Sequence, residues 1–162
     1  FKALIDRGLE VKILTNSLAS NDNLEAFSGY QRDRKALLET GASIYEFKPD
    51  AQIRKKIMSE VMQGQLQKMP IFGLHAKSMV IDDEITVIGT FNVDPRSANL
   101  NTESITIIPS AEVSLSVKKG MLEEMQPENA WQTTLKWNPD GEVSYLKRLS
   151  VKLRRIVPKE IL

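Results

Sequence analysis

The order of predicted elements in the first third of the chain is the strongest constraint on its fold. Residues 9–14 alternate apolar and polar side chains, which is typical of a strand. Residues 24–39 predict a helix that ends at Gly41, and residues 44–47 predict a second short strand. A strand, a helix and a strand in this order indicate a βαβ unit with a parallel strand pair. We therefore expect an α/β fold, with a mixed, largely parallel central sheet flanked by helices on both faces.

A second pattern predicts a hairpin in the middle of the chain. Two apolar runs, residues 76–81 and 85–88, are separated by the polar turn Asp82-Asp83-Glu84. Residues 104–108 then predict a third strand, with Ile105 and Ile107 facing inward. Residues 53–61 carry apolar side chains at helical spacing, and residues 64–73 are typical of a loop.

The only histidine of the chain, His75, lies two residues before Lys77. Side chains two apart on an extended segment emerge on the same face, with their Cα atoms about 7 Å apart. An ammonium group can neutralise phosphate oxygens, and an imidazole can attack phosphorus or transfer a proton. A lone histidine on a strand is more often a packed or surface residue, so the functional interpretation depends on the residues that follow.

Those residues continue the polar pattern on the far side of the hairpin. Thr90 and Asn92 offer a hydroxyl and an amide, and Gly89 allows a close backbone approach. Glu103 places a carboxylate where the third strand begins, and a carboxylate near an imidazole can fix its tautomer. We expect Arg96 to pair with a carboxylate such as Asp94 or Glu103 rather than with substrate.

This spacing resembles the HKD motif of the phospholipase D superfamily: His75-x-Lys77-x4-Asp82-x6-Gly89-Thr90-x-Asn92. The continuation is similar to the cardiolipin synthase-like branch, where the same pattern follows the second of two HKD motifs: Asn92-x-Asp94-x-Arg96-Ser97-x-x-Leu100-Asn101-x-Glu103. The resemblance extends over about residues 1–110 and rests on several defined positions at fixed spacing.

The resemblance implies a two-step exchange at phosphorus, in which one histidine forms a phosphohistidine and a second histidine protonates the leaving alcohol. It implies a phospholipid substrate, an alcohol acceptor, and neither a metal ion nor a cofactor. The roles that it assigns to this chain are nucleophile or acid/base for His75, phosphate binding for Lys77, Thr90 and Asn92, orientation of a histidine for Glu103, and structural support of the motif for Asp82.

A single histidine cannot supply both imidazoles of that mechanism. The second HKD half would come from an upstream segment or from a second copy of the chain. The start of the sequence in an apparent helix and the likeness to the second motif favour the upstream segment. We assign residues 1–162 to one phospholipase D-like domain, with residues 143–162 as a basic tail, and expect the C-terminal half of a longer protein.

The basic tail leaves two interpretations open. Its apolar residues fall at helical spacing among six lysines and arginines: Leu146, Leu149, Leu153 and Ile156. Such a helix can lie on an anionic membrane surface, which would suit a peripheral protein on the cytoplasmic face. Alternatively, it can pack its apolar stripe on the domain and leave its charges in water.

Composition narrows the choice among the remaining functions. The chain has no cysteine, which excludes thiolate chemistry, and its net charge of +1 makes nucleic acid a less favoured partner. We expect phosphatidyl transfer on a phospholipid. A metal-independent phosphodiesterase or nuclease with the same site is the second possibility, and a non-catalytic binding module is the third.

Overall fold

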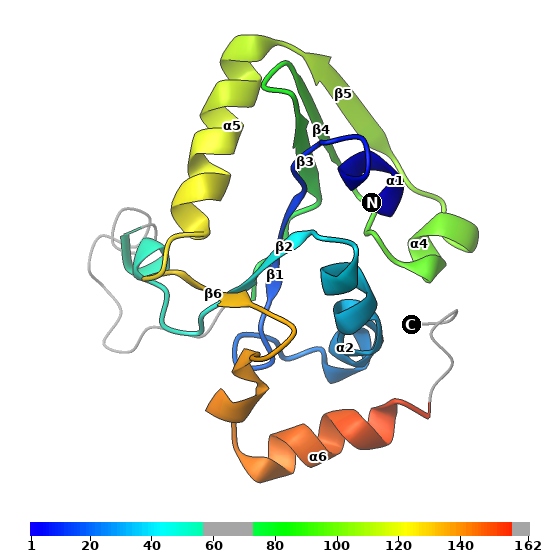
Figure 1. Cartoon of the computed structure of the whole chain (residues 1–162), viewed down its shortest axis with the longest axis vertical. Coiled ribbons are helices and arrows are strands. Elements are labelled where there is room, and N and C mark those ends of the chain that lie inside the picture. The colour runs from blue at the N-terminus through cyan, green and yellow to red at the C-terminus, as the bar shows by residue number, and fades with distance from the viewer. Residues whose placement is uncertain (57–72, 157–162) are drawn as a thin grey trace. The chain divides into compact units, whose positions relative to one another are not determined.

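A computed structural model describes residues 1–56 and 73–156 of the chain (Figure 1). These residues form two compact units with mixed α and β structure. The first unit is built from Phe1–Leu74 and Glu124–Arg155, and the second is built around His75–Glu123. The α/β class predicted from the sequence is confirmed.

The sheet of the first unit has three strands in the order β1-β2-β6. β1 (Lys12–Asn16) and β2 (Ser43–Phe47) run parallel, and the predicted βαβ unit is therefore confirmed. β6 (Ala130–Thr133) joins the other edge of β2 in the antiparallel direction. β6 has no clear sequence signal, because only four residues pair and their alternation is short.

Helix α2 (Leu24–Glu39) connects the two parallel strands and has the bounds that the sequence predicts. The Asn23 side chain caps its first turn by accepting a hydrogen bond from the backbone N–H of Ala26. Gly41 follows the helix with φ +95°, a conformation that side chains other than glycine rarely adopt. The short helix α1 (Lys2–Ile5) precedes β1.

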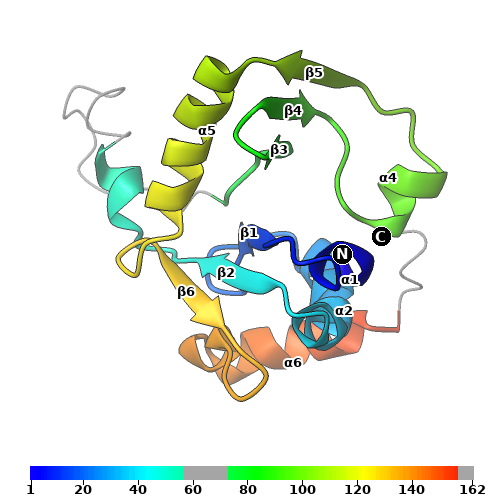
Figure 2. The same ribbon diagram turned by 45° about the horizontal axis from the view of Figure 1, so that its top comes forward.

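The C-terminal part of the first unit packs against α2. The 3-10 helix η1 (Pro139–Glu142) leads into α6 (Tyr145–Arg154), which lies beside α2 (Figures 1 and 2). Val151 of α6 is buried with Leu18 and Phe27 in the apolar core of this unit. Among the described residues, no helix is long and apolar enough to cross a bilayer.

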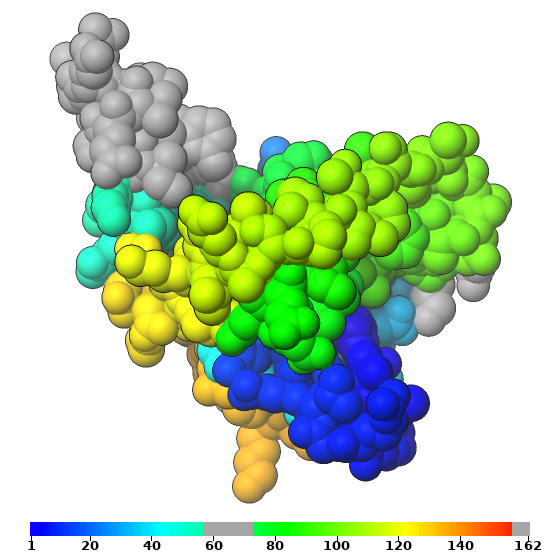
Figure 3. Space-filling view, turned by 90° about the horizontal axis from the view of Figure 1, so that it is seen from above, coloured from blue at the N-terminus to red at the C-terminus, as the bar shows by residue number. Residues whose placement is uncertain are grey.

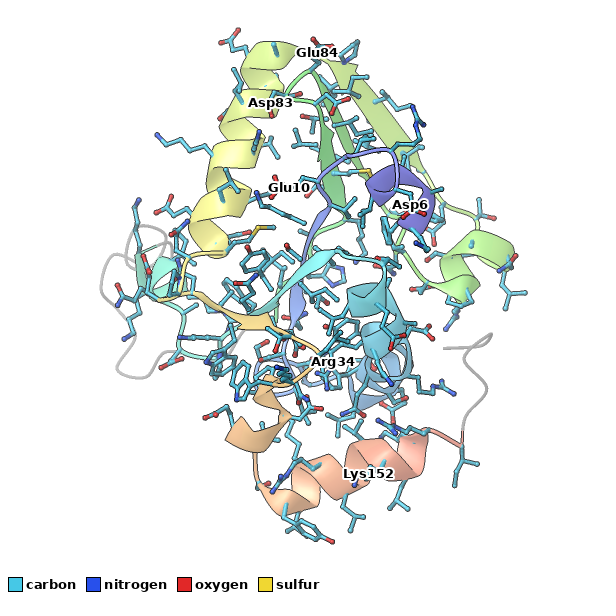
Figure 4. The ribbon with its side chains drawn as sticks, viewed as in Figure 1. Asp6, Glu10, Arg34, Asp83, Glu84 and Lys152 are labelled. Carbon is cyan, nitrogen blue, oxygen red and sulfur yellow. The ribbon has the colours of Figure 1, made fainter. Side chains whose placement is uncertain are left out.

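Polar side chains are buried next to that core. The guanidinium of Arg34 pairs with Glu46 and with Asp140, at 2.9 and 2.6 Å (Figure 4). The hydroxyls of Tyr30 and Thr133 donate to the same Glu46 oxygen at 3.1 and 2.9 Å. This cluster ties α2, β2, β6 and η1 together, because each of these elements contributes at least one of its members.

The second unit contains an antiparallel sheet in the order β3-β4-β5. β3 (Ser78–Ile81) and β4 (Ile85–Gly89) form the predicted hairpin, and β5 (Ile105–Pro109) is the predicted third strand. The turn places Asp82 and Asp83 at φ +49° and +60°, and Glu84 N–H donates to the carbonyl of Ile81. Positive φ at both central residues matches the turn type that suits tight hairpins.

Helix α5 (Ala111–Glu124) covers one face of this sheet (Figure 2). The Thr86 hydroxyl on β4 and the Ser114 hydroxyl on α5 lie 2.9 Å apart, and both side chains are buried. An ion pair between Lys118 and Asp83 links the helix to the hairpin turn. The space-filling view shows α5 and the sheet as one continuous surface (Figure 3).

Two details of the predicted fold are wrong. The sheet is not largely parallel: of the four strand pairs in the described residues, β1–β2 alone is parallel. The short connection between β3 and β4 permits only an antiparallel pair. Ile105 and Ile107 do not face inward, because Thr86 and Ile108 share the face that packs on α5.

Other predictions lie partly outside the described residues. Residues 52–56 are helical, which agrees with the start of the helix predicted at 53–61, whereas 57–61 and most of the loop at 64–73 are not described. The last residues of the basic tail are not described either. The assignment of the whole chain to one domain stays a prediction.

Candidate active site in the second unit

His75 and Lys77 lie on an extended segment, residues 73–77, that leads directly into β3. The carbonyl of Lys77 accepts a hydrogen bond of 3.0 Å from the N–H of Gly89, which continues the β3–β4 ladder by one step. On the preceding residue, the Asn16 side chain forms two bonds with the backbone of Leu74, at 2.6 and 2.7 Å. The backbone on both sides of His75 is therefore held by hydrogen bonds.

The side chains of His75 and Lys77 meet, as their spacing predicts. Lys77 Nζ lies 2.8 Å from His75 Nε2 and 3.5 Å from Nδ1. Both ring nitrogens lie within reach of the ammonium, and which of them accepts a hydrogen bond depends on the tautomer of the ring. The imidazole is exposed and the lysine is half-buried. This geometry places an exposed imidazole next to a cation, which suits attack on a phosphate that the lysine binds.

Gly89, the last residue of β4, allows β4 to come close to the segment that leads into β5. A Cβ atom at this position would lie 2.1 Å from the carbonyl oxygen of Ser104 and 2.8 Å from the Cα of Ile105. The expected close backbone approach at Gly89 is confirmed. It brings Thr90 beside Ser104, and their backbones pair through a 2.9 Å bond from the Thr90 N–H.

The Thr90 hydroxyl then donates to the Glu103 carboxylate and accepts from the N–H of Ser104 at 3.0 Å. Glu103 also receives hydrogen bonds from the side chains of Ser97 and Asn101. The hydrogen bond from Thr90, followed by those from Ser97 and Asn101, holds the pKa of Glu103 below its ordinary value. The positive charge of Lys77 acts in the same direction. Glu103 is therefore a carboxylate at neutral pH.

The short helix α4 (Pro95–Asn99) supplies part of this network. Asp94 caps the helix by accepting from the Ser97 N–H at 2.7 Å, and the Ser97 hydroxyl accepts from the N–H of Asn92 at 3.3 Å. Arg96 Nε donates to the Asn101 side chain at 3.2 Å. The expected ion pair of Arg96 is thus replaced by an amide contact, since Asp94 is engaged in capping.

An open hollow of about 460 Å³ lies over His75 and Lys77. It is lined by His75, Ala76, Lys77, Ser78, Ile88, Gly89, Thr90 and Val117. Sequence reasoning missed two residues that line the hollow: Ser78 at the start of β3, and Val117, which α5 contributes. Nothing in the sequence marked Val117, because α5 was not predicted. Ser97 was part of the motif quoted from the sequence but was assigned no role, although its position three residues after Asp94 is typical of a helix cap.

The structure does not bring every predicted site residue together. Asp82 occupies the hairpin turn, five residues along the strand from Lys77, which corresponds to about 16 Å. This position suits the structural role assigned to Asp82. Glu103 bonds with Thr90, Ser97 and Asn101, and its orientation of a histidine stays a prediction. Within the described part of the chain, no group of three or more acidic or histidine side chains could hold a metal ion.

Comparison with known protein families places this geometry in context. The family model of the cardiolipin synthase, PLD-like domain matches residues 1–125, which include all of the site described above. The chain belongs to the cardiolipin synthase PLD-like domain family. The residues that the family model matches include His75 and Lys77, whose side chains are in contact.

Curated relatives support the same assignment. The PLD-like domain is 34% identical to cardiolipin synthase C of Escherichia coli K12, over 97% of this chain and 36% of that protein. It is 34% identical to an uncharacterized protein of Helicobacter pylori J99, over 83% of this chain and 25% of that protein. Cardiolipin synthase 1 of Bacillus anthracis is 27% identical over 93% of this chain and 24% of its own length. The chain thus spans about a quarter to a third of these relatives.

Proposed function

We propose that this PLD-like domain transfers the phosphatidyl group of a phospholipid to an alcohol through a covalent intermediate on His75. The observation that carries the proposal is the 2.8 Å contact between Lys77 Nζ and His75 Nε2. A phosphate that displaces the ammonium from the ring would be bound by the cation and would lie against the ring nitrogen. Membership of the cardiolipin synthase family favours a phospholipid as the source of that phosphate.

The first step forms one bond and breaks one bond at phosphorus. His75 Nε2 attacks, the N–P bond forms, and the P–O bond to the head-group alcohol breaks. The leaving oxygen takes a proton from a general acid. In the second step an acceptor alcohol loses its proton to the same group and attacks phosphorus, and the N–P bond breaks. Water in place of the alcohol would give hydrolysis.

Other residues of the site stabilise the charge that moves during these steps. Lys77 neutralises the non-bridging oxygens, on which negative charge accumulates. Asn92 is exposed and could donate its side-chain amide to the same phosphate, as the family resemblance implies. Thr90 is held by Glu103 and Ser104, so we assign it the role of supporting the phosphate position rather than of proton transfer.

The general acid is proposed to be a second histidine outside this chain, because His75 is the only one here. The exposure of His75 and the open hollow beside it leave room for a second half to complete the site. A longer protein could supply that half, since the relatives are three to four times as long as the part matched here. A second copy of this chain is the alternative source.

The proposal is tested by product analysis with phosphatidylglycerol as the donor. The chain is incubated in EDTA with mixed micelles of this lipid, with and without added alcohol, over a wide range of protein concentration. We expect transfer to the added alcohol that is lost in His75→Ala, from the chain alone if two copies complete the site and otherwise only from a protein that also carries the upstream half. A specific activity that rises with protein concentration would identify a second copy as the source of the second half.

Two controls make a negative result informative. The assay is repeated with the completed protein, in which this chain is joined to an upstream PLD-like half. A soluble phosphodiester is tested as substrate in parallel. Activity on the soluble diester without any transfer on lipid would replace the proposal with a general phosphodiesterase. Absence of both activities in the completed protein would contradict catalysis altogether and favour a binding module.

A further inference from the structure

Helix α6 carries an apolar stripe that the first unit does not cover. Tyr145, Leu146 and Leu153 keep 68%, 73% and 61% of their surface exposed, and Leu149 keeps 39%. At 100° per residue these four side chains occupy an arc of about 100° on the helix. One of the two interpretations from the sequence placed this stripe against the domain. The exposure of these side chains contradicts that interpretation.

The opposite side of α6 is the side that anchors the helix. Val151 is fully buried against the core of the unit. Lys147 Nζ donates to the carbonyl of Asn21 at 3.0 Å, and Arg154 pairs with Glu25. With one face fixed in this way, the apolar stripe is held outward on a rigid element.

The exposed stripe is bordered by positive charge. Arg148 and Lys152 fall next to Tyr145 on the helix circumference, and both are exposed. Figure 4 labels Lys152 on α6. In the described part of the chain, neither side chain forms an ion pair with an acidic residue. No acidic residue occurs within α6 itself. An outward apolar stripe beside unpaired cations is the pattern of a helix that lies in an anionic bilayer surface.

We propose that Tyr145, Leu146, Leu149 and Leu153, with Arg148 and Lys152, form a surface that docks on an anionic phospholipid bilayer. The apolar side chains would enter the boundary between head groups and acyl chains, and the two cations would meet the head-group phosphates. A bilayer is preferred to a protein partner because of this charge complementarity, and because the proposed function, on which this choice rests, needs a phospholipid substrate. The surface differs from the catalytic residues, so binding and catalysis can fail separately.

The test measures binding of the whole chain to sedimented vesicles of phosphatidylcholine alone or mixed with phosphatidylglycerol. We expect binding to the anionic vesicles, and binding at least about tenfold weaker after the double substitution Leu146→Glu with Leu153→Glu. Arg148→Glu with Lys152→Glu should weaken binding mainly at low salt, because salt screens charge attraction. Leu115→Glu on α5, an exposed leucine of another helix, is the matched control and should bind normally.

A second measurement does not depend on loss of binding. The chain has no cysteine, so Leu153→Cys creates a single position for an environment-sensitive dye. We expect a blue shift of the dye on addition of anionic vesicles, and no shift for the control position Lys119→Cys on α5. Equal binding by the Leu146→Glu, Leu153→Glu variant, or a dye that stays in water, would overturn the proposal.

The remaining outcomes separate this inference from the proposed function. A concentration-dependent dimer that disappears in the Leu146→Glu, Leu153→Glu variant would assign the surface to a second copy and overturn the membrane assignment. Vesicle binding by a completed protein that keeps His75 but shows no transfer would support the docking surface while contradicting the proposed function. Transfer on dispersed short-chain lipid by a protein that does not bind vesicles would support the proposed function and contradict the docking surface.

Discussion

Lys77 Nζ lies 2.8 Å from His75 Nε2, so the single imidazole of the chain faces a cation across the distance of a hydrogen bond. A phosphate that replaces the ring as the partner of the lysine would lie directly against the imidazole. The consequences for catalysis and stability can be tested residue by residue.

Removal of the Lys77 charge should affect the reaction and leave the fold intact. We expect Lys77→Met to lower kcat/KM by about 10²–10³-fold, because one charged donor to the developing charge at phosphorus is lost. Lys77→Arg should retain part of the activity, since the charge remains. Steady-state kinetics on the completed protein measures the effect, and Lys119→Met on the exposed face of α5 is the control. Unchanged kinetics in Lys77→Met would exclude a role of this lysine in the reaction.

Gly89→Ala should destabilise the second unit. The added Cβ would lie 2.1 Å from the Ser104 carbonyl oxygen, and backbone atoms cannot move away as easily as a flexible side chain. We expect a decrease of about 1–3 kcal/mol in the free energy of unfolding, measured by urea titration.

Gly120→Ala on α5 is the matched control for that experiment. A Cβ at this position meets nothing within 4 Å, and alanine in a helix is favoured over glycine by about 0.5–1 kcal/mol. The two substitutions should therefore change stability in opposite directions. A Gly89→Ala chain as stable as the parent would contradict the close approach of β4 and β5.

The low pKa of Glu103 should depend on the hydroxyl at position 90. Thr90→Val removes the strongest of the hydrogen bonds that lower this pKa, so the pKa should rise toward its ordinary value. Thr90→Ser keeps the hydroxyl and should keep the pKa low. Carbon-detected NMR titration of the Glu103 carboxyl measures both variants, and identical titration in parent and Thr90→Val would refute the assignment.

The sign of the pH effect follows from the direction of this shift. A carboxyl group with a lowered pKa in the folded state stabilises the fold above its unfolded pKa. That contribution is lost as the pH falls through the folded pKa. Thr90→Val should therefore show a smaller loss of stability than the parent between mildly acidic and strongly acidic pH.

Removal of one partner of the Arg34–Glu46 pair should lower the free energy of unfolding. Arg34→Met leaves a fully buried carboxylate without its cation, and the expected loss is about 3–5 kcal/mol. Adding Glu46→Gln should recover much of this loss, because the uncompensated charge is then removed. Chemical denaturation of the two single variants and the double variant measures the coupling. Additive losses would show that the two groups do not depend on each other.

Acid should partly rescue Arg34→Met. Burial already raises the pKa of Glu46, and the positive charge of Arg34 opposes that rise. Without Arg34 the pKa should rise further. A carboxyl with a raised folded pKa favours the fold below its unfolded pKa, and this advantage is lost as the pH rises through the folded pKa. The stability deficit of the variant should therefore be larger at neutral pH than at mildly acidic pH.

Local patterns predicted much of the fold and most of the site. The bounds of α2 follow from its cap at Asn23 and from Gly41, and the hairpin follows from two apolar runs around an acidic turn. The meeting of His75 with Lys77 and the close approach at Gly89 also follow from spacing along extended segments. Each of these depends on neighbours in sequence.

The features that sequence reasoning missed depend on contacts between distant residues. Val117 reaches the hollow only because α5 packs on β4 through Ser114 and Thr86. The antiparallel pairing of β6 with β2 joins residues more than eighty positions apart. The outward orientation of the α6 stripe was undecided from sequence, since the contacts of Val151, Lys147 and Arg154 with distant residues determine which side is anchored.

The most direct test of the central claim is isolation of the covalent intermediate on His75. The completed protein is mixed with a short-chain phospholipid, quenched in base, where an N–P bond survives, and digested for mass spectrometry. We expect a phosphorylated adduct on the peptide that contains His75, which disappears when an acceptor alcohol is added and is absent in His75→Gln. Transfer that proceeds with no adduct on His75, or that continues in His75→Gln, would contradict the account.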